Sequence, residues 1–75
     1  MPKLPVISGK KLLMLLKKHG FIQVRQKGSH VFVEHQSREV STVIPIHRNE
    51  DLGKGILKSI LNDLDMTVDE LIKIL

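Results

Sequence analysis

The spacing of hydrophobic residues near the start of the chain is typical of an amphipathic helix. Apolar positions recur every three or four residues between positions 9 and 18, which is the period of one helix face. That face is expected to carry Leu12, Leu15, Leu16 and His19. Ser8 precedes the segment as a good N-cap, and Gly20 follows it as a residue suited to a left-handed helix end. We therefore predict a helix over about residues 9–18.

An alternating pattern follows the helical one and predicts two strands. Residues 21–26 alternate apolar and polar side chains, as in a half-buried strand, so that Ile22 and Val24 are expected on the buried face. The polar positions on the opposite face are Gln23 and Arg25. Residues 27–29 predict a short turn, and residues 30–35 predict the second strand.

Alternation also separates the two faces of the second strand. Val31 and Val33 suit a helix-covered core, which leaves His30, Phe32 and Glu34 on the other face. Phe32 would then be a partly exposed aromatic near Arg25, able to stack on a base or to anchor a protein partner. The reverse assignment, with Phe32 in the core, is also open at this stage. His35 ends the strand and is expected to be exposed to solvent.

The second half of the chain predicts one more strand and two helices. Residues 40–46 are β-branched and strand-like, and Pro45 marks an edge or the end of that strand. A helix is expected to begin within residues 52–55. Its buried stripe is expected to comprise Ile56, Leu57, Ile60, Leu61 and Leu64. Thr67 and Glu70 have the spacing of a capping box, which predicts a last short helix over residues 69–75.

This order of elements predicts an α+β fold for residues 1–75 as one domain. The arrangement is α-β-β-β-α followed by a short C-terminal helix, with a three-stranded antiparallel sheet and the helices on one of its faces. The other sheet face would be open, which leaves a surface for a partner.

The distribution of charge along the chain is more informative than the overall composition. The net charge is +4, and the first acidic residue of the chain is Glu34. The preceding segment carries Lys3, Lys10, Lys11, Lys17, Lys18, Arg25 and Lys27. This segregation favours an anionic partner, either a nucleic acid or an acidic protein, over a lysine-rich face that is merely solvated.

Several classes of protein are not indicated. The chain has no cysteine, so it offers neither disulfides nor a cysteine-ligated metal site. No histidine pair has the helical spacing of a metal site, and we expect no metal and no cofactor. No run of signal-peptide or membrane-span length is visible, so we expect a cytoplasmic protein without membrane contact.

The stretch 27–30 carries the most suggestive chemistry. His30 opens a strand next to a glycine and a basic residue, and histidine can move protons near neutral pH. RNA supplies its own nucleophile, the 2′-hydroxyl, so a ribonuclease needs only a base, positive charge and a proton donor. Candidate RNA-binding residues are Arg25, Lys27, Gly28, Ser29 and Lys54. The proton donor is open between His47, Lys27 and water.

The chain also resembles the HicA family of bacterial toxins. The resemblance rests, in order, on segments 16–21, 24–30, 43–47 and 53–60, with Gly28-Ser29-His30 and the Pro45 to His47 stretch at specific spacing. It implies a fold like a double-stranded-RNA-binding domain used as an endoribonuclease that cleaves messenger RNA, and neutralisation by a HicB-type antitoxin. It places the family's catalytic histidine at His30. Many relatives carry threonine where Ile56 stands.

Three function classes are therefore open. The first is a metal-independent endoribonuclease toxin of a type II toxin–antitoxin system, with His30 as general acid or base. The second is a non-catalytic RNA-binding module of the same fold. The third is a protein-interaction domain that docks an acidic partner through its basic helix and the Phe32 face. The first and third are compatible, because a toxin must be blocked by its antitoxin.

Overall fold

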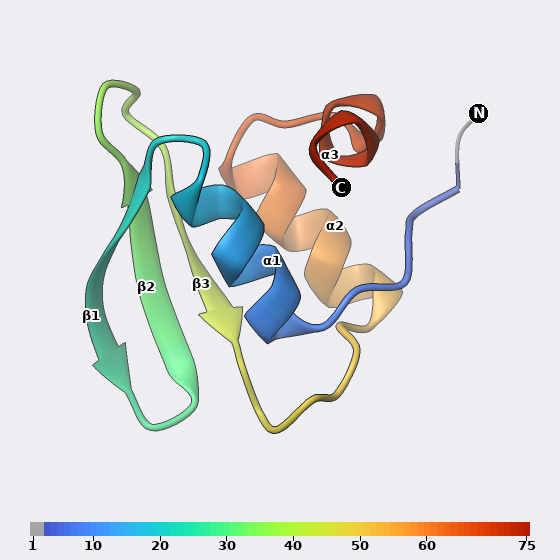
Figure 1. Ribbon diagram of the computed structural model, residues 1–75, viewed down its shortest axis with the longest axis horizontal. Coiled ribbons are helices and arrows are strands. Elements are labelled where there is room, and N and C mark those ends of the chain that lie inside the picture. The colour runs from blue at the N-terminus through green and yellow to red at the C-terminus, as the bar shows by residue number, and fades with distance from the viewer. Residues whose placement is uncertain (1–2) are drawn as a thin grey trace.

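Three helices and one three-stranded sheet make up the described part of the chain, residues 3–75, in the computed structural model (Figure 1). The elements are α1 (Gly9–Lys17), β1 (Phe21–Lys27), β2 (His30–His35), β3 (Ser41–Pro45), α2 (Lys54–Asp63) and α3 (Val68–Ile74). The strands pair antiparallel in the order β1-β2-β3. The predicted α+β fold is confirmed. Within residues 3–75 no helix has the length and apolar character needed to cross a membrane.

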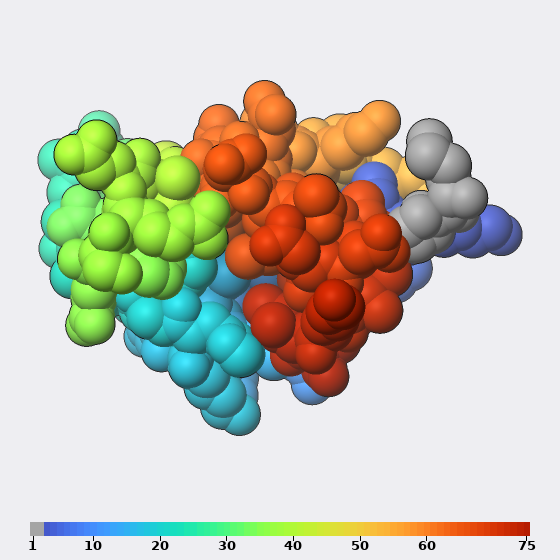
Figure 2. All heavy atoms as spheres, turned by 90° about the horizontal axis from the view of Figure 1, so that it is seen from above, coloured from blue at the N-terminus to red at the C-terminus, as the bar shows by residue number. Residues whose placement is uncertain are grey.

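One hydrophobic core joins the sheet to the helices. The side chains with almost no exposed surface are Leu12, Leu16, Val31, Val33, Ile44, Leu57, Leu64 and Leu71. Val31 and Val33 are buried while His30 and Glu34 are exposed, so the predicted faces of β2 are correct. α3 adds Leu71 to this core, and in the view from above it lies between the β2–β3 loop and the N-terminal segment (Figure 2).

The helix ends follow the predicted capping residues. The Ser8 hydroxyl accepts a hydrogen bond from the backbone N–H of Lys11 at 3.1 Å, and Gly20 follows α1 with a φ of 90°. In α3 the Thr67 hydroxyl accepts from the Glu70 N–H at 3.1 Å, and the Glu70 carboxylate accepts from the Thr67 N–H at 2.9 Å. The predicted capping box is therefore present, and α3 begins at Val68, one residue before the predicted start.

Two predicted core positions at the ends of helices are wrong. His19 is exposed, because α1 ends at Lys17 and Lys18 caps it, so His19 lies in the turn beyond the helical face. Ile56 keeps 49% of its surface exposed, whereas Leu57, Ile60 and Leu61 are buried as predicted. Ile56 lies in the first turn of α2, where the helix borders a groove instead of the core.

The prediction for the first strand is wrong in its buried face. Ile22 and Val24 are 39% and 54% exposed, and the buried residue of β1 is Phe21. β1 is an edge strand, so the helices cover only its beginning. A β-bulge between Gln23 and Arg25 also interrupts the alternation, since two residues there oppose one residue of β2.

His35 is not the solvent-exposed histidine that its position suggested. Its ring packs edge-on against Phe21, with the ring centroids 4.8 Å apart. Its Nδ1 accepts hydrogen bonds from the backbone N–H groups of Ser37 and Arg38, each at 3.1 Å. His35 is therefore a structural residue that holds the β2–β3 loop against the start of β1.

Candidate functional site

The turn between β1 and β2 is held by hydrogen bonds on both sides. Gly28 has a φ of 60°, a conformation that favours glycine, and no atom lies within 4 Å of where its side chain would begin. Its carbonyl accepts a bond from the Gln26 side chain at 2.9 Å. The Ser29 carbonyl accepts from the Ile46 N–H at 2.7 Å. This turn is therefore open to solvent at Gly28 and is bonded through Ser29 to Ile46, the residue after β3.

His30 is placed on the sheet face that the helices leave uncovered, called the open face below. Its cross-strand partners are Lys27 on β1 and Pro45 on β3, and side chains of directly opposite residues share a face. His30 and Lys27 are both exposed. The fold thus brings a histidine and a lysine together beside the open turn.

The next row of the open face contains an arginine stacked on an aromatic ring. Phe32 pairs with Arg25 on β1 and Val43 on β3. The guanidinium carbon of Arg25 lies 4.4 Å from the centroid of the Phe32 ring, which is a cation–π contact. The β-bulge produces this pairing, because it turns Arg25 onto the same face as Phe32. Phe32 is therefore the partly exposed aromatic of the predicted arrangement, not a core residue.

His47 and Lys54 lie apart from this group. His47 is exposed and follows Ile46, whose N–H is bonded to the turn; it borders a small cavity together with Glu50 and Asp51. Lys54 begins α2 and lines a different hollow, which contains no residue of the β1–β2 turn. Of the predicted site residues, Arg25, Lys27, Gly28, Ser29 and His30 come together.

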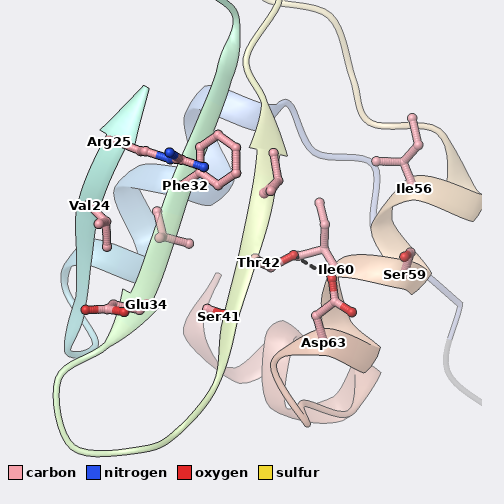
Figure 3. Close-up of a pocket in the computed structure, with 12 residues that line it drawn as sticks. Val24, Arg25, Phe32, Glu34, Ser41, Thr42, Ile56, Ser59, Ile60 and Asp63 are labelled. Atoms are coloured by element: carbon pink, nitrogen blue, oxygen red, sulfur yellow. Dashed lines mark hydrogen bonds between the residues drawn. The ribbon is translucent and has the colours of Figure 1, made fainter. Parts of the chain in front are cut away.

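A groove continues from the open face to α2 and was not predicted from the sequence. It has a volume of about 690 Å³, and Figure 3 shows Arg25 and Phe32 on its sheet side and Ile56 and Ser59 on its helix side. At its base the Thr42 hydroxyl donates to the Asp63 carboxylate at 2.9 Å, which ties β3 to α2 (Figure 3). Ser59 and Asp63 gave no signal in the sequence, because only the packing of α2 beside β3 brings them to the groove.

No arrangement suited to a metal ion is found in residues 3–75, where no three His, Asp or Glu side chains lie close together.

The family assignment comes from one comparison. Residues 9–66 match the family model described as the HicA toxin of bacterial toxin–antitoxin systems. No curated protein and no solved structure matches the chain. The matched segment runs from the start of α1 to the residue before the α3 cap and includes the whole open face. The chain therefore belongs to the HicA family, the toxins of bacterial toxin–antitoxin systems.

Proposed function

We propose that this toxin is an endoribonuclease that cleaves messenger RNA, with His30 as its general acid–base residue. The observation that carries the proposal is the exposure of His30 on the open face, directly opposite Lys27 and next to the turn at Gly28. A histidine there is accessible to a phosphodiester, whereas His35 is occupied with loop contacts.

The reaction requires a base for the 2′-hydroxyl. A neutral His30 imidazole would take the proton from that hydroxyl, and the 2′-oxygen would then attack the adjacent phosphorus. The bond from phosphorus to the 5′-oxygen breaks, and that oxygen takes up a proton. The products are a 2′,3′-cyclic phosphate and a 5′-hydroxyl. Acid–base catalysis of this kind contributes about 10²–10⁴-fold in rate.

The surroundings of His30 suit a phosphate group. The Lys27 ammonium can neutralise the charge on the phosphate oxygens, and Arg25 offers a planar fork of donors one row away. Gly28 lacks a side chain, and the space above it is empty, so an RNA backbone can approach the turn at Gly28 and Ser29 closely.

We propose Lys27, His47 or water as the proton donor to the leaving 5′-oxygen, and Lys54 as a more distant contact with the RNA chain. His47 is one residue beyond Ile46, which is bonded to the turn at Ser29.

The natural partner that this proposal implies is a HicB-type antitoxin acting in the cytoplasm. Membership of the family implies a toxin–antitoxin pair. An antitoxin that covers the face carrying His30 would exclude RNA from it. The nuclease function and the protein-interaction function are therefore compatible.

The test is RNA cleavage by the wild type, His30→Ala and His19→Ala, with a chelator present to check metal independence. We expect cleavage with 5′-hydroxyl and cyclic-phosphate ends for the wild type, and a loss of at least about 100-fold for His30→Ala. His19→Ala is the matched control, since His19 is exposed in the turn after α1. Full activity and full toxicity of His30→Ala would refute the proposal, and intact RNA with undiminished binding would favour the non-catalytic module.

A further inference from the structure

The groove between the open face and α2 begins at Phe32, two residues along β2 from His30. We propose that it is a base-binding subsite for a nucleotide next to the cleaved bond, and that it prefers bases with an exocyclic amino group. This inference rests on the ribonuclease function proposed above and adds a determinant of substrate choice to it.

The position of the groove follows from the strand geometry. His30 and Phe32 are two residues apart on β2, so their side chains leave the same face about 7 Å from each other. Phe32 and its partners Arg25 and Val43 form the near wall of the groove. A nucleotide whose phosphate is at His30 can therefore extend its base along the strand into the groove.

The walls of the groove suit a flat aromatic ring. The Arg25 guanidinium lies over the Phe32 ring at 4.4 Å, and bases stack on both aromatic rings and guanidinium planes. Across the groove Ile56 is 49% exposed, and Val24 beside Arg25 is 54% exposed. Figure 3 shows Ile56 on the α2 side of the groove. A base would cover apolar surface that is otherwise in contact with water.

The charges favour a base over a phosphate. Glu34 and Asp63 line the groove, so a phosphodiester placed there would meet two carboxylates. Carboxylates instead accept hydrogen bonds from base amino groups. One oxygen of Asp63 is bonded to Thr42, which leaves the other able to accept, and the Ser59 hydroxyl lies on the same helix side. Adenine, cytosine and guanine carry such an amino group, and uracil does not. The Lys27 ammonium would hold the RNA backbone at the turn instead.

The same charges disfavour an acidic protein segment in the groove. Its carboxylates would face Glu34 and Asp63, so charge complementarity is better for a nucleobase. A protein partner is nevertheless a measurable alternative, because the antitoxin can be tested on the same variants.

The experiment measures binding without cleavage, using 2′-O-methyl hexanucleotides whose blocked hydroxyls cannot attack. The probes are the adenine and cytosine hexamers, the uracil hexamer and an abasic hexamer with the same phosphates. We expect the adenine and cytosine hexamers to bind the wild type about tenfold more tightly than the abasic hexamer, and the uracil hexamer to lie between them because it stacks but has no amino group. Phe32→Leu and Ile56→Ala should remove most of that difference.

The matched control is Ile72→Ala, which removes the same atoms from an isoleucine of similar exposure on α3, 42% against 49% for Ile56. It should keep the tenfold preference. Circular dichroism checks that each variant is folded, and Ile56→Ala tests the groove even where Phe32→Leu disturbs the sheet.

Each other outcome has one meaning. Equal binding of the abasic and adenine hexamers, or no binding of any hexamer, would overturn the base subsite. Loss of antitoxin binding in Ile56→Ala with unchanged RNA preference would also overturn it and assign the groove to a protein. Base preference without cleavage of unmodified RNA would support the groove and contradict the nuclease proposal instead.

Discussion

Two glycines, Gly9 and Gly28, are constrained in different ways at the end of the sheet that carries His30. Gly9 begins α1 where the helix packs directly on the carbonyl group of Pro45, so a side chain at Gly9 would collide with backbone atoms. Gly28, in contrast, has open space around it and is set by its positive φ. The first glycine fixes α1 against β3, and the second leaves the turn accessible beside His30.

The contact at Gly9 predicts a stability effect that opposes helix propensity. Gly9→Ala should destabilise the protein by about 1–3 kcal/mol, because the added methyl group forces α1 away from Pro45. Gly55→Ala is the control, since nothing lies within 4 Å of that position in α2, and it should be neutral or stabilising by up to about 1 kcal/mol. Urea unfolding measures both. Equal stability of Gly9→Ala and the wild type would show that the contact is not restrictive.

Among the elements, α3 is a short helix whose start depends on local hydrogen bonds. It spans only Val68–Ile74 and places one fully buried residue, Leu71, in the core. Its start is fixed by the reciprocal bonds between Thr67 and Glu70. The hydrogen bonds from Thr67 lower the pKa of the Glu70 carboxyl below its ordinary value of 4.5. The ionised form is therefore the one that stabilises the helix start.

The lowered pKa of Glu70 predicts how the stability of α3 depends on pH. A carboxyl with a lowered folded-state pKa contributes stability above its unfolded pKa and loses it as the pH falls through the folded value. Wild-type stability should therefore decline below about pH 4.5 more steeply than that of Glu70→Gln. Thermal unfolding between pH 6 and pH 3 tests this. Parallel curves for the two proteins would mean that the capping carboxylate does not contribute.

At the scale of the whole molecule, the excess of positive charge is divided between two ends. Lys17 lies at the end of α1 that adjoins Gly20, and Gly20 is bonded to Gln36 in the β2–β3 loop. Lys27 lies at the other end of the sheet, beside His30. Both lysines are exposed. Replacing one lysine at each end therefore tests which end of the molecule the RNA backbone contacts.

Salt dependence distinguishes these two ends. Binding of non-cleavable RNA should weaken with salt, and Lys27→Ala should reduce the slope of log K against log salt by about 0.7, the value for one phosphate contact to a single strand. Lys17→Ala should leave the slope unchanged. Fluorescence anisotropy at several salt concentrations measures both slopes. Equal changes for the two variants would indicate diffuse charge attraction without a defined path past His30.

The order of the elements was predictable because the local signals agree. Ser8, Gly20 and the Thr67–Glu70 pair are capping signals that act within a few residues, and the structure places each at the end of a helix as predicted. The predictions that failed concern which side chains are covered. Ile22, Val24 and Ile56 are apolar, yet they face solvent or the groove, because their exposure depends on a bulge and on where α2 ends up beside the sheet.

Periodicity, turn residues and charge are local properties. They were sufficient to predict the α+β order of elements, the exposed position of His30 and the basic first part of the chain. The strand register around His30 and the groove next to Phe32 came only from the three-dimensional packing. Strand pairing put Lys27 opposite it and the bulge put Arg25 on Phe32. The packing of α2 beside β3 brought Asp63 to Thr42 and created the groove. The contact between Thr42 and Asp63 joins residues 21 positions apart, and no local pattern encodes a contact at that separation.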